Sequence, residues 1–284
     1  MIEARVCDAV TITPPPQTRC AFVLEAIAAR MHVVADKPFA PNAPGGRDLD
    51  AAAQAKGVTL GVFHNRRRDA DMQTLAKLIA DDRLGTIWRI HNRMDFNDPA
   101  MNEAGPTGGL LRDLGSHLVD QLLWLSGPAR RVDAQLDFVD LPAGRTDASF
   151  TITLRHTSRV HSHISVSKLN RYNLREVSAY GDRGAYVSHS SDVQAQSIFA
   201  GKRPVDELTS WGYEPEPNWS TLYTLAGTER VPSEKGRYHD YYEAFESAVR
   251  NGKQPPVTAE QSIRTLAYLD AAFQSTEEGR SIYL

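Results

Sequence analysis

Asp113 and His117 are the residues whose types and spacing best suit chemistry. They lie four residues apart in a segment, Gly108–Leu125, whose leucines recur at three- and four-residue spacing, as on one face of a helix. One helical turn would separate the two side chains, so the Asp113 carboxylate could orient the His117 imidazole or raise its pKa. Such an imidazole suits general acid–base catalysis near neutral pH, although a solvated Asp–His pair shows the same spacing.

Further polar groups follow three short apolar runs near the N-terminus. These runs begin about 25 residues apart and are joined by helical patterns, which predicts right-handed βαβ crossovers and a parallel sheet. The runs are Ala9–Thr13, His32–Ala35 and Val58–Phe63. Since ligands of open α/β sheets bind beyond the carboxyl ends of the strands, we expect one wall of a site there. The clusters concerned are Thr13–Pro16, Asp36–Pro38 and His64–Arg68.

The rest of the chain has a different pattern of predicted secondary structure. Strand-like runs between residues 132 and 189 are joined by short turns without a long helix, which predicts an antiparallel sheet. We expect a loop from Gly201 to Tyr238 and two helices after it. The predicted fold is therefore α/β: a partial doubly wound parallel sheet in residues 1–67, followed by an α+β domain in residues 68–284 with a large open antiparallel sheet.

Three other clusters of residues are less specific indicators of a functional site. The run Arg66–Arg68 could hold a phosphate or carboxylate, or it could be a solvated strand end. His161 and His163 share one face of a predicted strand, but no third ligand follows at a suitable spacing, so we expect no metal. We expect those histidines to face solvent or another subunit, and Tyr238, Tyr241 and Tyr242 to serve in packing.

Composition excludes several classes of protein. The 284 residues carry a net charge of -3, which argues against nucleic-acid binding. No apolar run approaches the length of a membrane span, and no signal peptide is visible. The two cysteines are too few for a disulfide framework and predict a reducing, cytoplasmic location.

Several motifs together resemble the Gfo/Idh/MocA oxidoreductases. They are Asp36-Lys37-Pro38 after a strand, and Gly108-Gly109 followed by Asp113, Gly115, His117 and Asp120 in the helical segment. Further matches are the N-terminal Asp8-Ala-Val-Thr-Ile-Thr-Pro-Pro, the tail from Tyr241-Tyr-Glu-Ala-Phe to Pro256-Val-Thr, and Glu278-Gly-Arg280. The run Phe63-His-Asn-Arg-Arg67, with Asp36 where Glu is commoner, is similar to the subgroup that includes scyllo-inositol dehydrogenases.

The resemblance implies a Rossmann domain and hydride transfer between NAD or NADP and a carbinol carbon of a sugar, polyol or inositol. It implies that Lys37, Asp113 and His117 are catalytic and, with Asp120, contact the substrate. It places the cofactor along Thr13, Pro14, Asp36 and Lys37, with Arg66 or Arg67 near its carboxamide or the substrate. It also implies a homodimer or homotetramer formed through the antiparallel sheet.

One departure leaves alternatives open. The family begins with a strand and a G-x-G-x-x-G turn, and this sequence contains no such motif. The resemblance therefore implies an N-terminally truncated Rossmann domain, which puts cofactor binding in doubt and hides the preference between NAD and NADP. A non-catalytic remnant that binds a ligand or dimerises is one alternative, and a lyase or hydratase using Lys37 and His117 without external hydride is another.

Overall fold

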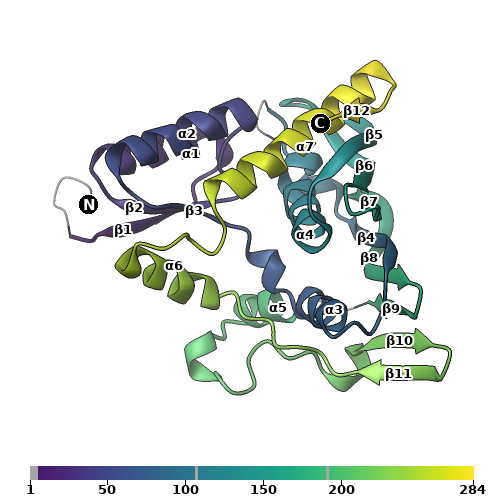
Figure 1. The fold of residues 1–284 in the computed structure, drawn as a ribbon. Coiled ribbons are helices and arrows are strands. Elements are labelled where there is room, and N and C mark those ends of the chain that lie inside the picture. The colour runs from purple at the N-terminus through teal and green to yellow at the C-terminus, as the bar shows by residue number, and fades with distance from the viewer. Residues whose placement is uncertain (1–5, 106–107, 190–191) are drawn as a thin grey trace.

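The computed structural model describes residues 6–105, 108–189 and 192–284. The described chain forms a three-stranded sheet near the N-terminus and a nine-stranded sheet in the remainder (Figure 1). The elements of the first sheet are β1 (Ala9–Ile12), α1 (Pro16–Ala28), β2 (His32–Asp36), α2 (Ala43–Lys56) and β3 (Leu60–Phe63). All its pairs are parallel, in the order β1-β2-β3, so the predicted βαβ fragment is confirmed.

Helices cover both faces of this small sheet. Helices α1 and α2 lie on one side, and α6 (Asp240–Asn251) lies on the other (Figure 1). Tyr241 and Phe245 of α6 pack on Val34 of β2. Gly61 of β3 leaves room for this contact, because a Cβ there would collide with both aromatic side chains. The packing explains the continuous apolar runs in the sequence, since a strand buried on both faces needs no polar alternation.

The second sheet has the strand order β11-β10-β9-β8-β4-β7-β6-β5-β12. Its strands are β4 (Ile87–Asn97), β5 (Ala129–Leu141), β6 (Gly144–His156), β7 (His161–Ser167), β8 (Leu169–Gly181), β9 (Gly184–Ser188), β10 (Ser220–Thr224), β11 (Gly227–Val231) and β12 (Ile282–Tyr283). The predicted antiparallel sheet is confirmed except where β4 inserts beside β7 and runs parallel to it. Turn lengths could not predict this pair, because β4 is separated in sequence from the meander it joins.

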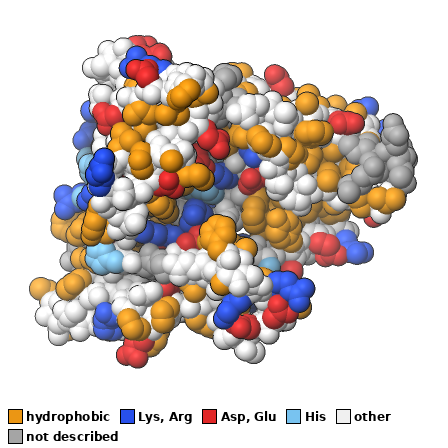
Figure 2. Space-filling view, turned by 180° about the vertical axis from the view of Figure 1, so that it is seen from behind, with side chains coloured by type: hydrophobic (Ala, Val, Ile, Leu, Met, Phe, Trp, Pro, Cys, Tyr) orange, Lys and Arg blue, Asp and Glu red, His pale blue; other side chains and the backbone are white. Residues whose placement is uncertain are grey.

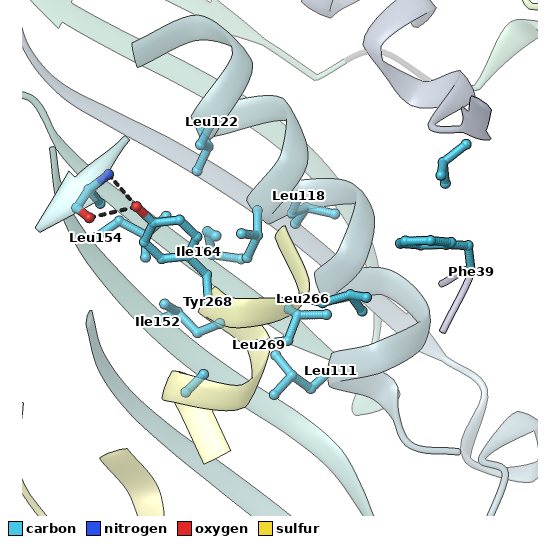
Figure 3. Close-up of a cluster of buried hydrophobic side chains, with 14 of the residues drawn as sticks. Phe39, Leu111, Leu118, Leu122, Ile152, Leu154, Ile164, Leu266, Tyr268 and Leu269 are labelled. Atoms are coloured by element: carbon cyan, nitrogen blue, oxygen red, sulfur yellow. Dashed lines mark hydrogen bonds between the residues drawn. The ribbon is translucent and has the colours of Figure 1, made fainter. Parts of the chain in front are cut away.

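Helices pack on one face of the large sheet and tie it to the small one. The remaining helices are α3 (Ala70–Ala80), α4 (Ser116–Ser126), α5 (Val193–Phe199) and α7 (Ala259–Glu278). Helix α7 contacts α4, β5 and α2, and its Tyr268 hydroxyl bonds both the N–H and the carbonyl of Ala129 at 2.7 and 2.6 Å (Figure 3). One apolar core therefore runs through both parts of the chain.

The segment from Gly201 to Tyr238 is not the loop that the sequence predicts, because it contains the β10–β11 hairpin. In β10, Leu222 is the buried apolar side chain and Ser220 is also buried, whereas most of β11 is exposed. An edge hairpin with so little apolar alternation gives a weak strand signal. No helix in the described part of the chain is long and apolar enough to span a membrane.

Candidate active site

The carboxyl ends of β1, β2 and β3 meet at one edge of the small sheet. Thr13 and Pro14 follow β1, Lys37 follows β2, and His64 follows β3. The view from behind shows a recess near the middle of the molecule where Lys and Arg side chains gather (Figure 2). This edge agrees with the site wall that the strand order predicts.

Lys37 joins this edge to the turn that precedes α4. Its Nζ donates to Oδ1 of Asp113 at 2.8 Å and to the Asp113 carbonyl oxygen at 3.1 Å. An ammonium group has three donors, so one N–H of Lys37 stays available for a ligand. Burial alone would raise the pKa of Asp113, but Lys37 and the nearby Lys168 and Arg66 lower it below its ordinary value. Asp113 is therefore ionised at neutral pH and accepts the hydrogen bond from Lys37 as a carboxylate.

A π-helical turn, Leu111–Gly115, presents Asp113. Gly109 precedes the turn with φ +97°, and the Asp147 carboxylate accepts a hydrogen bond from the Leu111 N–H at 2.6 Å. A Cβ at Gly109 would collide with this carboxylate. The continuous α-helix predicted from Gly108 is thus wrong at its start, and the wider turn removes the regular stacking of residues four apart.

His117 does not form the expected pair with Asp113. The structure describes both residues and shows no hydrogen bond or ion pair between them; Nδ1 of His117 is buried without a partner. Burial, reinforced by Lys37 and Arg66, lowers the pKa of His117 well below 6.5. The expected rise in this pKa has the wrong sign, because the π-turn directs Asp113 to Lys37 instead. His117 is consequently a neutral imidazole at neutral pH, and it is not on a solvated face.

A cavity of about 240 Å³ opens beside Lys37 and Asp113, and Arg19, Asp36 and Lys168 also line it. Lys168 directly follows β7, and its Nζ lies 3.7 Å from Oδ2 of Asp113. Lys168 was not predicted from the sequence. The strand-end rule applies to parallel strands, and the parallel pairing of β7 with β4 is a long-range contact that no local pattern reveals.

The arginines of the run Arg66–Arg68 bind acidic side chains of the chain itself. Arg67 donates to both carboxylate oxygens of Asp120 at 2.7 Å, and Arg66 lies 2.9 Å from Asp192. Such a bidentate pair uses the strongest donor geometry of the guanidinium group. The run is therefore not a solvated strand end. Contacts of these residues with a cofactor or substrate stay predictions.

His64 lies next to the Arg67–Asp120 pair. Its Nδ1 is 3.7 Å from Oδ2 of Asp120, and the side chain is buried. Desolvation lowers the pKa of His64 to about 4, although Asp120 acts in the opposite direction. His64 and His117 are thus two neutral imidazoles on the buried side of the site.

Tyr238 has a polar role where the sequence predicted packing. Its hydroxyl donates to Asp69 in a short hydrogen bond and lies 3.0 Å from Asp192. Arg175 binds the same Asp69 at 2.5 Å and Asp71 at 2.9 Å. Burial raises the pKa of Tyr238, so its hydroxyl stays protonated. Packing is confirmed for Tyr241, which belongs to the cluster beneath the small sheet.

The two histidines of β7 are half-buried on the large sheet. His163 lies opposite His91 of β4, with ring centroids 4.9 Å apart, and its Nδ1 lies 3.2 Å from the Thr153 hydroxyl. Three potential metal ligands come within 4.8 Å of one another at a single place in the described residues, His239, Asp240 and Glu243. There, Arg237 already donates to Asp240 at 2.7 Å.

Comparisons with known proteins agree with this fold and site. The model of an oxidoreductase family with an NAD-binding Rossmann fold matches residues 1–64. The model of the C-terminal α/β domain of the same family matches residues 76–284. The chain therefore belongs to the Gfo/Idh/MocA family and is an NAD(P)-dependent dehydrogenase.

Individual relatives cover nearly the whole chain. It is 31% identical to the scyllo-inositol 2-dehydrogenase (NADP(+)) IolW of Bacillus subtilis, over 98% of this chain and 79% of that protein. It is 30% identical to the uncharacterized oxidoreductase YdgJ of Escherichia coli, over 98% and 81%. Among solved structures, the putative oxidoreductase yvaA of Bacillus subtilis superposes with a TM-score of 0.92 at 31% identity, covering all of this chain and 82% of that one.

Proposed function

We propose that this protein transfers a hydride between NAD(P) and a carbinol carbon of an inositol, polyol or sugar. The observation that carries the proposal is the 2.8 Å contact of Lys37 with Asp113 at the strand-end edge of a Rossmann-type sheet. Beside it lies the neutral His117, whose buried Nδ1 has no hydrogen-bond partner in the described chain. The name of the relative IolW makes inositols the first substrates to test.

The residues present fit the nicotinamide end of the cofactor. The cavity beside Lys37 offers both charges and hydrogen-bonding groups, and Nε of Arg19 in its wall is buried without a partner. We propose that Thr13, Pro14, Asp36 and Lys37 hold this end. No residue is assigned to the pyrophosphate, because the sequence contains no G-x-G-x-x-G.

The side chains have complementary tasks. The bound nicotinamide would supply the hydride acceptor. Lys37 donates its remaining N–H to the substrate oxygen and stabilises the negative charge that develops there. His117, being neutral, accepts the hydroxyl proton at an imidazole nitrogen. Asp113 holds the Lys37 ammonium in place through two contacts.

The environment of His117 favours this direction of proton transfer. A neutral imidazole is a competent acceptor at any pH above its lowered pKa. Lys37, Arg66 and Arg175 oppose a lasting positive charge on the ring. We propose that Asp120 acts on the substrate only through Arg67, whose two N–H groups it binds.

Two further features bear on the cellular location and the oligomeric state of the enzyme. Both cysteines are free, and we propose the reducing cytoplasm as its location.

Helices α4 and α7 cover one face of the large sheet, whereas no helix of the described chain covers the other (Figure 1). We propose that a second copy packs against this open face.

Two measurements test the function. Fluorescence titration of the purified chain with NADH and NADPH should give saturable binding, and the tighter ligand identifies the cofactor. A panel of inositols, polyols and sugars should then contain one that reduces the preferred oxidised cofactor. Absence of saturable binding would favour a non-catalytic ligand-binding protein, and turnover without reduced nicotinamide would favour a lyase.

A further inference from the structure

Lys168 is a second lysine at the catalytic carboxylate. Oδ1 of Asp113 accepts a hydrogen bond from Lys37 at 2.8 Å, and its other oxygen, Oδ2, lies 3.7 Å from Nζ of Lys168. Each carboxylate oxygen therefore faces a different ammonium group. Both lysines and Asp113 line the same cavity.

The place of Lys168 is fixed by its main chain and by its side chain. Its N–H donates to the Ala148 carbonyl at 3.0 Å, and its own carbonyl accepts from the Asp98 N–H at 3.3 Å. Its Nζ donates to the Met101 carbonyl oxygen at 2.6 Å, and only 13% of the side chain is exposed. Lysine is seldom enclosed to this degree unless its charge is used. The ammonium is thus held against Asp113.

One carboxylate cannot neutralise two ammonium groups. Arg66 also lowers the pKa of Asp113, and His117 on the following turn is neutral. Two further carboxylates, Asp36 and Glu103, line the same cavity, and Asp36 is paired with Arg19 at 3.5 Å. The cations that act on Asp113 together keep it ionised. Because Lys168 also compensates the charge of the Asp113 carboxylate, Lys37 does not have to do so alone. The remaining N–H of Lys37 can then donate to a substrate oxygen that gains negative charge.

We propose that Lys168 is a positioning residue that holds the Asp113 carboxylate through the oxygen which Lys37 does not contact. Its consequence for a substrate oxygen rests on the proposed function, whereas its effect on Asp113 belongs to the free protein. The direction of the Asp113 pKa, lowered by Lys37 and Lys168 against burial, agrees with this geometry.

The decisive test is the titration of Asp113 itself. The carboxyl-carbon NMR signal of Asp113, assigned by its loss in Asp113→Asn, is followed against pH in the wild type and in Lys168→Met. We expect Asp113 to become a weaker acid by about tenfold in Lys168→Met, since an opposite charge at this distance shifts a carboxyl pKa by about one unit or more. Lys168→Arg should restore the wild-type midpoint.

Two controls keep the result clear. Lys56→Met removes an exposed lysine at the end of α2 and should leave the Asp113 midpoint unchanged. Lys168→Gln replaces Lys168→Met if the latter loses its native circular dichroism. An unchanged midpoint in a folded Lys168→Met or Lys168→Gln protein would overturn the proposal.

Kinetics separate this proposal from the proposed function. In an active enzyme, Lys168→Met should lower kcat/KM, and Lys168→Arg should restore it. A shifted midpoint in a chain without dehydrogenase activity would contradict the proposed function and leave the role of Lys168 standing. A shifted midpoint with an unchanged kcat/KM would overturn the catalytic consequence of Lys168.

Discussion

Lys37 and Asp113 lie 76 residues apart in the sequence, and their side chains meet at 2.8 Å. The contact joins the end of β2 in the small sheet to the π-turn before α4 on the large sheet. It therefore fixes the two parts of the chain at the place where a cofactor and a substrate would meet. The predictions below test the residues that maintain this arrangement.

The pair Arg67–Asp120 should behave as a structural unit. Its side chains are only 11% and 2% exposed, so truncating one partner leaves a buried charge without compensation. We expect Asp120→Ala to lower the free energy of unfolding by about 3–5 kcal/mol. Adding Arg67→Met should recover part of this loss, as measured by a double-mutant cycle in urea. The exposed pair of Glu246 and Arg250 is the control, where Glu246→Ala should cost under about 1 kcal/mol. Additive losses for Arg67 and Asp120 would refute the coupling.

Gly109 should be required for the active-site turn. Gly109→Ala combines a positive φ with a collision against Asp147, so it should lower both the free energy of unfolding and kcat. The matched control is Gly201→Ala, which has φ +78° and no atom within 4 Å of the added Cβ. We expect it to lose only about 1–2 kcal/mol of backbone energy, and Gly109→Ala about 1–3 kcal/mol more. Equal losses in the two variants would show that Asp147 does not restrict this position.

His64 should make the fold sensitive to acid. In the folded protein it stays neutral down to about pH 4, whereas in the unfolded chain it takes up a proton below about 6.5. Between these values protons bind the unfolded state preferentially, so its contribution to stability is complete above pH 6.5 and is lost as the pH falls to 4. The loss is on the order of 3 kcal/mol. Urea unfolding of His64→Gln across this range should show a shallower decline, whereas the exposed His189→Gln should follow the wild type. Parallel curves for His64→Gln and the wild type would contradict the assignment.

The open face of the large sheet should bind a second copy. Thr151 is exposed on β6, the third strand from the β12 edge of this sheet, and it pairs with Ser165 of β7. We expect light scattering at micromolar concentration to give a dimer or tetramer. Thr151→Arg should reduce the mass, because it brings a buried charge into the interface. A monomeric wild type would remove this part of the account.

Local patterns predicted the βαβ fragment and brought Lys37, Asp113 and His117 forward as candidate site residues. Lys37, Asp113 and His117 could be found because a strand end and a helical repeat are each recognisable within a short stretch of sequence. The sequence did not predict that Asp113 pairs with Lys37 and not with His117. This pairing depends on the π-turn, and that turn is held by Asp147, 36 residues beyond the Leu111 N–H that it binds.

Other contacts escaped the sequence for the same reason. Arg67 and Asp120 are 53 residues apart, and each alone resembled a solvated or ligand-binding side chain. Lys168 became visible only when β4 was found to run parallel to β7. Long-range pairing thus decided which charged groups remain free for ligands.

The central claim is tested most directly by the rate at which nicotinamide is reduced in the wild type and in His117→Ala. His117 is buried, and its Nδ1 has no hydrogen-bond partner in the described chain, so the variant should fold and should still bind the cofactor. With the best substrate of the inositol, polyol and sugar panel, we predict that His117→Ala loses about 10²–10⁴-fold in kcat, the usual share of a general base. A folded His117→Ala protein that reduces the cofactor at the wild-type rate would contradict the account.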